Sequence, residues 1–412
     1  MAQIYPFNAL LYHSARVKDA SRVLCPPYDV MTRDQAAEMR ARDAHQFARI
    51  ILKDPDASDY HANAVRMREW QQEGYLSKEK PALYLYRQRF FYGERMRERH
   101  AWMVAVLLEE LGAHHVFGHE HIYPVFADDR TEIMRTLQMQ LSPVFGLVKA
   151  SGDHLVEYEN AISCQTPCVQ AASAYDQGEH TLWQVPSHLE PLLLDKLQSA
   201  CIVIADGHHR YQAAYQLAER NGALGKPAQA ESQVLMALVQ ADDPGLLVLP
   251  THRSLKEAPP WEEWRKRAED QFEITRLTRD QALTFTLEPT HGPIPQFVAC
   301  AGGDYWHLTV KEDVWHRHQS EEPLQKELAT YWSDAVIGHR WLNVSAQTRY
   351  AAISYDHAAA DALRRKAAVT FLHAPLSVNT IMELAQRGCR MPQKSTYFFP
   401  KLASGVCCRV FK

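Results

Sequence analysis

The sequence predicts a mixed α/β fold of the α+β kind, in which mixed sheets pack with helices. Short runs rich in β-branched and aromatic residues recur along the chain, as in 82–92 and 233–239, and are typical of strands. Between them lie segments whose apolar residues recur at helical spacing, such as the one that starts near residue 208. The 412 residues, 46% of them hydrophobic and 23% charged, suit a globular protein of two or three domains.

The first part of the chain combines helices with a predicted β-hairpin. The Pro26-Pro27 pair forbids a helix, and Thr32 follows as a helix cap. Gly74 fits the end of a helix, and Gly93 fits the turn between two adjacent strands. In chain order we expect helices over 32–42 and 57–74, strands over 82–92 and 99–108, a helix over 132–141 and a strand over 143–148.

The rest of the chain alternates strands and helices, without an internal repeat or an obvious linker. We expect strands over 181–185, 202–205, 233–239, 246–249 and 351–355, with short strands between 273 and 320. We expect helices over 189–198, from 208 or 209 onward, and over 261–272. We place domain borders near 150 and 255. The predicted division is an N-terminal α+β domain over 1–150, a central core over 151–255 and a C-terminal α+β domain over 256–412.

The bulk composition narrows the possible classes of function. A net charge of −4 gives no global basic field, which argues against nucleic acid as a partner. No run of about 18 apolar residues is present, so no membrane span is expected. The first residues lack the charged start and apolar core of a signal peptide, and the eight cysteines are scattered. We therefore expect reduced thiols and a cytoplasmic location.

One segment in the middle of the chain carries the strongest functional signal. A β-branched run ends at Asp206, Gly207 permits a positive φ angle, and a helix follows from His208 or His209. The first turn of a helix attracts anions, and Arg210 adds a planar fork for phosphate or carboxylate. Two imidazoles and a carboxylate can hold a metal or move protons. The segment predicts a phosphate-binding site whose side chains can also bind a metal or transfer protons. The alternative is a helix start without a ligand.

Four further islands concentrate polar residues. His119 and Glu120 can act as an acid–base pair or bind a divalent ion. Arg253 can add an anion contact, and Lys394 with Lys401 can form a phosphate-binding loop that lacks the glycines of a Walker A loop. The structural alternatives are a polar loop for 118–121 with 128–130, a rigid turn for 26–29, a solvated strand end for 250–253 and a basic surface strand for 394–396 with Lys401.

These islands resemble, in order, the motifs of the family catalogued as domain of unknown function 1015 (DUF1015). The pattern is Pro-Pro-Tyr-Asp, His-Glu followed by Asp-Arg, Ala-Asp-Gly-His-His-Arg, and Met-Pro-x-Lys-Ser-Thr-x-Phe-x-Pro-Lys. The chain carries these motifs at 26–29, 119–120 with 129–130, 205–210 and 391–401, so the resemblance spans nearly its whole length. The family name implies no activity, but its members are often encoded beside serine-biosynthesis genes, which points to serine or phosphoserine.

A shorter motif, Gly207-x-x-Arg210-x-x-Ala213, is similar to the Gly-x-x-Arg-x-x-Ala box of the ParB/sulfiredoxin superfamily. In that superfamily the box lies between a strand and a helix and binds nucleotide phosphates. The similarity implies a ParB/sulfiredoxin-like core of strand, glycine loop and helix within the α/β fold. The superfamily includes DNA-partition proteins, a sulfinic-acid reductase and free-serine kinases. The reductase needs a cysteine where this chain has His208 or His209, so that activity is not expected.

Together these features predict an enzyme. We expect a small-molecule phosphotransferase or phosphohydrolase, a kinase or a phosphatase, that acts on serine or phosphoserine. Its cofactors would be Mg²⁺ and ATP or ADP, and its partner a small phosphorylated metabolite or a nucleotide. One alternative is a nucleotide-binding switch without turnover, and another is a scaffold with a vestigial site.

Each candidate residue has an expected role in this hypothesis. Catalysis is assigned to His208, His209, Glu120 and Asp206, with a histidine as general base or as nucleophile. Phosphate binding is assigned to Gly207, Arg210, Arg130, Arg253, Lys394, Ser395, Thr396 and Lys401. Substrate contacts are assigned to Tyr28, Asp29 and His119, and metal binding to Glu120, Asp129 and Asp206. That these islands meet in space is itself part of the prediction.

Overall fold

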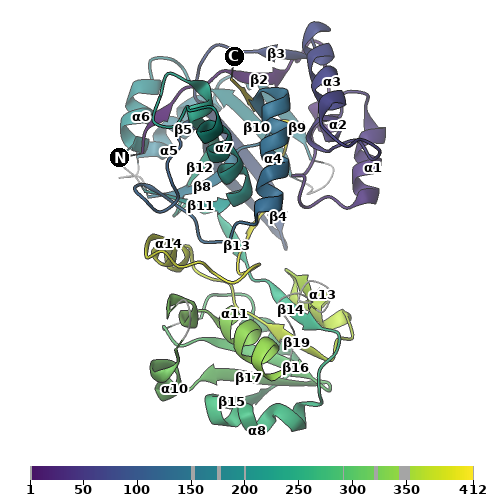
Figure 1. Cartoon of the computed structure of the whole chain (residues 1–412), viewed down its shortest axis with the longest axis vertical. Helices are drawn as coiled ribbons and strands as arrows, with labels where there is room; N and C mark the ends of the chain where they lie inside the picture. Colours follow the sequence, from purple (N-terminus) through teal and green to yellow (C-terminus); the bar gives the residue numbers. More distant parts are fainter. Residues whose placement is uncertain are drawn as a thin grey trace. The chain divides into compact units, whose positions relative to one another are not determined.

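The computed structural model describes residues 2–149, 154–173, 178–198, 201–290, 292–319, 323–342 and 353–411. These residues form two compact units, each built from strands and helices (Figure 1). Unit 1 contains the described residues of Met1–Gly118, Ile122–Leu246 and Pro400–Lys412. Unit 2 contains His119–His121 and the described residues of Leu247–Phe399. The mixed α/β class predicted from the sequence is confirmed.

The division into two units differs from the three segments expected from the sequence. Strands from both sides of residue 150 pair in one sheet of unit 1, so no border falls there. The change of unit at Leu246 lies near the expected border at 255, but the chain returns to unit 1 at Pro400. Local periodicity carries no information about which distant strands pair, and this explains the difference.

The largest sheet of unit 1 is mixed. Within the described residues its strand order is β6-β11-β8-β12-β5-β4-β10-β9, and β1 pairs with β5. β12 runs parallel to β8 and β11 parallel to β6, while the other neighbours are antiparallel. The strands are β1 (Ile4–Tyr5), β4 (Tyr84–Tyr92), β5 (Arg95–Leu107), β6 (Val116–Phe117), β8 (Val144–Val148), β9 (Val169–Ala172), β10 (Glu179–Gln184), β11 (Ile202–Asp206) and β12 (Gln233–Gln240).

Helices α4 (Pro124–Leu137) and α7 (His208–Arg220) pack against each other in unit 1 (Figure 1). The apolar stripe of α7 expected from the sequence, which includes Tyr211 and Leu217, lies in one buried cluster with Met236 of β12. This packing holds α7 along its length and leaves its N-terminus at the end of β11.

The remaining elements of unit 1 surround this core. The other helices are η1 (Ala20–Arg22), α1 (Arg33–Arg42), α2 (Ala48–Ile51), α3 (His61–Gln72), α5 (His154–Ser163), α6 (Glu190–Gln198) and η2 (Ala230–Ser232). A smaller sheet has the order β3 (Leu76–Lys78), β2 (Ala9–Tyr12), β21 (Cys408–Val410) and β7 (Met139–Gln140). The pairing of β21 with β2 joins the two ends of the chain within unit 1.

Helix α4 begins at Pro124, well before residue 132, where the sequence predicted its start. Proline is tolerated at the first helical position, because the N–H that it lacks would have no partner inside the helix. This correction places Asp129 and Arg130 on the helix, so their side chains are held by a regular element.

Unit 2 is built around a second sheet. For the part of the chain that the structure describes, its order is β15-β17-β16-β19-β14-β18, with antiparallel neighbours, while β13 pairs separately with β20. The strand expected over 351–355 lies partly outside the described residues. In the described part, β18 begins at Ile353. The strands are β13 (Leu247–Leu249), β14 (His252–Leu255), β15 (Phe272–Leu277), β16 (Gln296–Ala301), β17 (Asp304–Val310), β18 (Ile353–Asp356), β19 (Val369–Leu372) and β20 (Tyr397–Phe399). The helices are α8 (Trp261–Gln271), α9 (Arg279–Phe285), α10 (Glu312–Arg317), η3 (Pro323–Glu327), α11 (Ala329–Tyr331), the π-helix η4 (Trp332–Trp341), α13 (Ala359–Arg364) and α14 (Val378–Gln386).

Two expectations from composition can be compared with these elements. Across the ranges that the structure describes, none of the helices combines the length and the apolar character that a bilayer span needs. All eight cysteines are free, in line with the expected thiols.

Gly146 in β8 provides a test of how tightly the sheet of unit 1 is packed. A Cβ atom at this position would lie 2.8 Å from Cδ2 of Leu238 and 2.9 Å from Cγ2 of Ile202. We expect Gly146→Ala to lower the free energy of unfolding, measured in urea, by about 1–3 kcal/mol, the usual cost of an overpacked core. Leu238→Val shortens the nearer side chain, so the double variant should lose less than the sum of the two single losses. Additive losses would contradict this explanation.

Candidate functional site

The residues predicted for the site are divided between the two units. Unit 1 contains Tyr28, Asp29, Asp129, Arg130, Asp206, Gly207, His208, His209, Arg210 and Lys401. Unit 2 contains His119, Glu120, Arg253, Lys394, Ser395 and Thr396. The strongest arrangement lies in unit 1, at the start of α7.

The start of α7 is the candidate anion site predicted from the sequence. Strand β11 reaches Asp206 through a β-bulge after Ile204, Gly207 turns the chain with a φ of 93°, and the helix begins at His208. No side chain caps the helix, and its first turn closes where the Tyr211 N–H donates to the Gly207 carbonyl oxygen over 2.9 Å. The amides of a helix's first turn make no bond within the helix, and together with the helix dipole they favour an anion.

Position 207 requires glycine for two reasons. Its φ lies in the left-handed region, which other residues rarely adopt. A Cβ atom there would also lie 3.0 Å from the guanidinium carbon of Arg210. Glycine therefore keeps both the turn and the Arg210 side chain in place.

The Asp206 carboxylate lies between two cations. Its Oδ2 accepts a hydrogen bond from Nη2 of Arg210 over 2.7 Å, and its Oδ1 pairs with Nζ of Lys401. Burial alone raises the pKa of this carboxyl, but the charges of Lys401 and Arg210 outweigh burial and hold the pKa well below its usual range. Asp206 is therefore an ionised group that positions two cations, and its low pKa makes it a weak general base.

The Arg210 guanidinium is occupied inside unit 1. Besides its bond to Asp206, it donates through Nη1 to the carbonyl oxygen of Pro143, and its side chain is only 11% exposed. This geometry does not favour the direct phosphate contact expected from the sequence. Arg210 instead ties the first turn of α7 to the end of β11 and to the residue before β8.

Lys401 reaches Asp206 because two buried residues of the β4–β5 hairpin hold its backbone. Nη2 of Arg99 donates to the carbonyl oxygen of Pro400 over 2.6 Å, and Nε2 of Gln88 donates to that of Lys401 over 3.1 Å. Arg99 also donates to the side chain of Gln88. The returning segment is therefore fixed on the sheet next to the start of α7.

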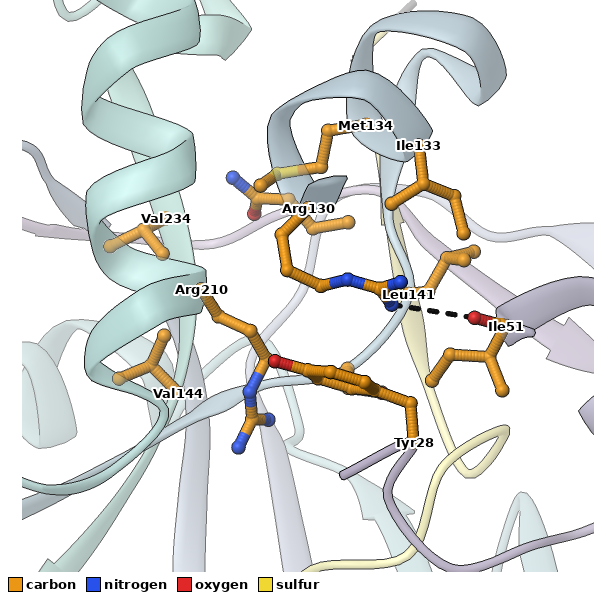
Figure 2. Close-up of a pocket in the computed structure, with 11 residues that line it drawn as sticks. Tyr28, Ile51, Arg130, Ile133, Met134, Leu141, Val144, Arg210 and Val234 are labelled. Atoms are coloured by element: carbon orange, nitrogen blue, oxygen red, sulfur yellow. Dashed lines mark hydrogen bonds between the residues drawn. The ribbon is translucent and has the colours of Figure 1, made fainter. Parts of the chain in front are cut away.

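Tyr28 and Arg130 lie beside Arg210 around a small cavity (Figure 2). The guanidinium carbon of Arg130 is 3.9 Å from the centre of the Tyr28 ring, and the Tyr28 hydroxyl lies next to the Arg210 side chain. Burial and the nearby Asp29 carboxylate raise the pKa of Tyr28 to about 12, so the hydroxyl stays protonated at neutral pH. The cavity volume is about 30 Å³, enough for water but not for a nucleotide.

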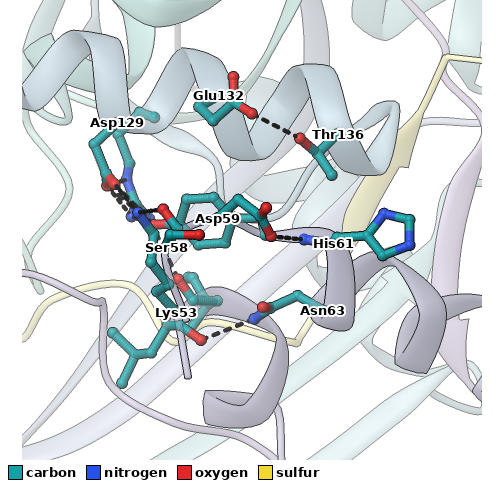
Figure 3. A network of polar contacts seen from close by, with 12 residues as sticks. Lys53, Ser58, Asp59, His61, Asn63, Asp129, Glu132 and Thr136 are labelled. Atoms are coloured by element: carbon teal, nitrogen blue, oxygen red, sulfur yellow. Dashed lines mark hydrogen bonds and ion pairs between the residues drawn. The ribbon is translucent and has the colours of Figure 1, made fainter. Parts of the chain in front are cut away.

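Asp129 and Arg130 belong to a polar network that also contains Lys53 and Tyr60 (Figure 3). The Tyr60 hydroxyl donates to the Asp129 carboxylate, at 3.0 and 3.1 Å from its two oxygens. Nε of Arg130 donates to Asp129 over 3.0 Å, and its Nη2 donates to the Tyr60 hydroxyl over 2.7 Å. The side chains expected to bind metal and phosphate are thus engaged with each other.

The two histidines of the motif differ in environment. His208 is 1% exposed, and its ring lies against Gly118, where a Cβ atom would be 3.0 Å from its Cδ2. His209 is half-buried, and its Nε2 accepts a hydrogen bond from the Tyr123 N–H over 3.2 Å. Burial lowers the pKa of His209, against the opposing effect of the Asp29 charge. A general base needs an accessible nitrogen that can accept a proton. His208 is buried and Nε2 of His209 already accepts a hydrogen bond, so neither ring suits this role.

Arg253 is fully buried in unit 2, and its guanidinium is occupied. Nε lies 2.6 Å from Oδ1 of Asp334, and Nη1 donates to the carbonyl oxygen of Thr251 over 2.6 Å. Nη2 donates to the carbonyl oxygens of Gln393 and Lys394 over 3.1 and 3.3 Å. Arg253 therefore fixes the turn at Lys394, whose φ is 57°, and the structure does not favour the phosphate contact expected of it.

The His119 segment and the Lys-Ser-Thr turn meet within unit 2. Nε2 of His119 is 3.2 Å from Oγ1 of Thr396, and the Met391 N–H donates to the His119 carbonyl oxygen over 2.7 Å. Glu120 forms a short parallel bridge with Met391. The buried Ser395 hydroxyl donates to a backbone carbonyl of the same turn over 2.6 Å. These islands are brought together, but the hydroxyls expected to bind phosphate hold the turn instead.

The three expected metal ligands do not form a metal centre. Asp206 and Asp129 are each paired with cations, and Glu120 belongs to unit 2. The described residues contain no group of three or more His, Cys, Asp or Glu side chains placed to hold a metal ion. Binding of Mg²⁺, which takes few protein ligands and often phosphate oxygens, stays a prediction.

Sequence reasoning missed Gln88, Arg99 and Tyr60. A polar residue in a predicted antiparallel strand is expected to face solvent, so neither Gln88 nor Arg99 attracted attention. The hairpin register contained a signal, because a turn at Gly93 places Gln88 opposite Arg99. A glutamine and an arginine paired across two otherwise aromatic strands indicate a buried polar pair with a further partner.

A family model described as "Protein of unknown function (DUF1015)" matches residues 4–331, and the chain belongs to this family. No curated protein matches the chain. Similar solved structures include a free serine kinase in complex with AMP, at 12% identity and a TM-score of 0.35, covering 69% of this chain and 83% of that one. SbnI with a C-terminal truncation from Staphylococcus aureus has 11% identity and a TM-score of 0.36, covering 73% and 84%. A conserved hypothetical protein from Pyrococcus furiosus has 12% identity and a TM-score of 0.33, covering 70% and 88%. These likenesses are too distant to support a function.

A pH titration of stability tests the ion pairs of Asp206. Because its folded-state pKa is depressed, its contribution is complete above its unfolded-state pKa, about 4, and is lost as the pH falls toward the folded-state value. We expect Asp206→Asn to be less stable than the parent by about 3 kcal/mol at neutral pH, because two cations lose their partner. The difference should shrink below about pH 4, as measured by urea denaturation.

Asp128→Asn is the matched control for this titration. Asp128 is an exposed carboxylate of α4 that lies 3.7 Å from Arg220, so its removal should cost little at any pH. A deficit of Asp206→Asn that stays constant down to about pH 3 would show that the ion pairs do not cause it.

Proposed function

We propose that this protein transfers a phosphoryl group between a nucleotide and a small hydroxyl-bearing molecule, with serine or phosphoserine as the candidate substrate. The observation that carries the proposal is the open start of α7, between Gly207 and the buried Lys401–Asp206 ion pair. Backbone amides, a helix dipole and a neighbouring lysine are what phosphate ligands favour. The ParB/sulfiredoxin-like box from Gly207 to Ala213 supports a nucleotide as the phosphate ligand.

Lys401 is the cation that we assign to the bound phosphate. Its ammonium group has three donors, so it can donate to a phosphate oxygen and keep its ion pair with Asp206. Arg210 is held by two acceptors and keeps Asp206 in position. The phosphate would therefore contact the α7 amides and Lys401, with Arg210 behind them as support.

Asp29 is the residue that we assign as general base. His208 is buried, Nε2 of His209 already accepts a hydrogen bond, and the pKa of Asp206 is strongly depressed. Asp29 is exposed, and its charge acts on both Tyr28 and His209. No hydrogen bond or ion pair engages its carboxylate among the residues that the structure describes. An exposed carboxylate near Tyr28 and His209 can accept a proton from the hydroxyl group of a bound substrate.

The atoms and electrons of the proposed step balance with the nucleotide, the substrate and Asp29 as proton acceptor. The substrate hydroxyl oxygen bonds to the terminal phosphorus while the bond from that phosphorus to its bridging oxygen breaks. The leaving nucleotide keeps the electron pair of the broken bond, and the hydroxyl proton passes to Asp29. With water in place of the substrate hydroxyl, the same groups would hydrolyse the phosphate.

A nucleotide-binding switch without turnover is the second candidate. One observation favours it: the residues first expected to move protons in unit 1, namely His208, His209 and Asp206, are buried or already bonded. Such a site suits recognition better than chemistry. This candidate differs from the first in one respect, because it predicts binding without product.

Phosphate binding is tested by comparing two glycine variants of the full chain. Gly207 precedes α7 and Gly222 follows it, and both have a positive φ, but a Cβ at Gly222 meets no atom within 4 Å. We expect Gly207→Ala to weaken binding of ADP and pyrophosphate by about tenfold or more, which corresponds to about 1.4 kcal/mol. Gly222→Ala should leave both affinities unchanged. Equal affinities of the two variants, measured by titration calorimetry with magnesium present, would remove this turn from the site.

Turnover is tested with ATP and serine, by detecting phosphoserine in ³¹P NMR spectra. We expect Asp29→Asn to lower kcat by about 10²–10⁴-fold, the usual contribution of a general base, with nucleotide affinity unchanged. Asp128→Asn serves as the control for loss of a negative charge. Full kcat in Asp29→Asn would exclude Asp29 as the base. A parent protein that binds nucleotide but forms no product would favour the switch.

A further inference from the structure

We propose that Tyr123, Phe126 and His209 form a subsite for the base of a nucleotide whose phosphates lie at the start of α7. The inference rests on the proposed function, because it takes phosphate binding at that helix end as given. It adds the part of the ligand that the amides and Lys401 do not address, namely a flat aromatic ring. We call these three residues the aromatic cluster.

The aromatic cluster is a packed group around the imidazole of His209, the second residue of α7. The Tyr123 ring is inclined by 28° to the imidazole, with 6.4 Å between ring centres. The Phe126 ring stands at 77° to the imidazole with 5.4 Å between centres, and at 80° to the Tyr123 ring. Edge-to-face pairs of this kind stabilise each other, so the cluster forms a defined surface.

Much of this surface faces solvent. Phe126 is 55% exposed, Tyr123 is 37% exposed and the adjacent Val125 is 76% exposed. Further along α4 the large apolar side chains Ile133 and Leu137 are buried, as is usual for a helix that covers a sheet. Contiguous exposed apolar side chains beside a polar site indicate a place where a ligand covers them.

His209 joins the aromatic cluster to the helix end. The Tyr123 N–H donates to Nε2 of His209 over 3.2 Å, so the neutral imidazole carries its proton on Nδ1. Burial lowers the pKa of His209, which keeps the ring neutral at pH 7. Nδ1–H is then available to donate to a ring nitrogen, a carbonyl or a ribose hydroxyl. His209 thus suits ligand orientation rather than proton abstraction.

The positive charge at the start of α7 indicates which ligand binds the aromatic cluster. The backbone of His209 lies in the first turn of α7, where we propose that phosphate binds, while its imidazole lies in the aromatic cluster. A ligand that contacts both needs an anionic group and a planar ring joined by a few bonds, which describes a nucleotide. An apolar peptide would leave the helix end without an anion, so we favour a nucleotide base, which stacks on aromatic rings regardless of its identity.

The experiment compares ADP, CDP and pyrophosphate as ligands of the full chain in titration calorimetry. The test variant is Phe126→Ala, and Phe126→Tyr is the conservative variant that keeps a ring. Phe91 of β4 is 51% exposed, and Phe91→Ala is the matched control for the loss of an exposed aromatic side chain. We expect Phe126→Ala to weaken ADP and CDP binding by about tenfold and to leave pyrophosphate binding within about twofold. Phe126→Tyr and Phe91→Ala should bind all three ligands as the parent does.

The other outcomes separate this inference from the proposed function. Parent-like affinity of Phe126→Ala for ADP and CDP would overturn the base subsite, and so would an equal loss for pyrophosphate. Equal affinity of the parent for pyrophosphate, ADP and CDP would also overturn the base subsite. The phosphate site would then stand, and a protein partner would be the ligand of the aromatic cluster. A parent that binds none of the three ligands would overturn the proposed function and this inference together.

Discussion

The ionised carboxylate of Asp206 is the interaction on which the candidate site depends. It connects the end of β11, the first turn of α7 and the segment that returns to unit 1 at Pro400. Removing charges from water is costly, and such a group is stable only if each charge keeps its partners. Here Arg210 has a second acceptor in the Pro143 carbonyl, so the arrangement extends to the start of β8. The start of α7, where we propose that phosphate binds, is thereby held in one geometry.

Support for this carboxylate comes from the β4–β5 hairpin. The pair of Gln88 and Arg99 binds the backbone of Pro400 and Lys401, which sets where the lysine side chain starts. Buried polar networks of this kind are favourable only when every member is satisfied, and they then permit a single arrangement. A substitution at Gln88 or Arg99 is therefore expected to displace Lys401 from Asp206.

Local features of the candidate site were predictable because they depend on residues close in sequence. The β-branched run, Gly207 and the helical spacing from Tyr211 onward predicted the strand, the turn and α7, and each is present. The early start of α4 was missed; Pro124 occupies the first helical position, which tolerates proline.

The partners of charged side chains were not predictable. Arg210 and Arg253 were both expected to bind phosphate, yet each donates to backbone carbonyl oxygens and pairs with a carboxylate of the protein. An arginine in a motif has the same five donors whether it binds a ligand or the fold, and only the tertiary structure distinguishes the two. The grouping of the His119 segment with the Lys-Ser-Thr turn likewise depends on a pairing between residues far apart in the chain.

The position of Lys401 has a consequence for biosynthesis. It follows Asp206 by 195 residues, and the residues of Leu247–Phe399, which belong to unit 2, are made between them. Because translation adds residues one by one and earlier segments fold first, β11 and α7 emerge from the ribosome long before their second cation. β21, which pairs with β2, also follows unit 2 in the sequence. Unit 1 is thus begun before unit 2 and continued after it, so the Lys401–Asp206 ion pair forms only on a polypeptide whose synthesis has passed through the whole of unit 2.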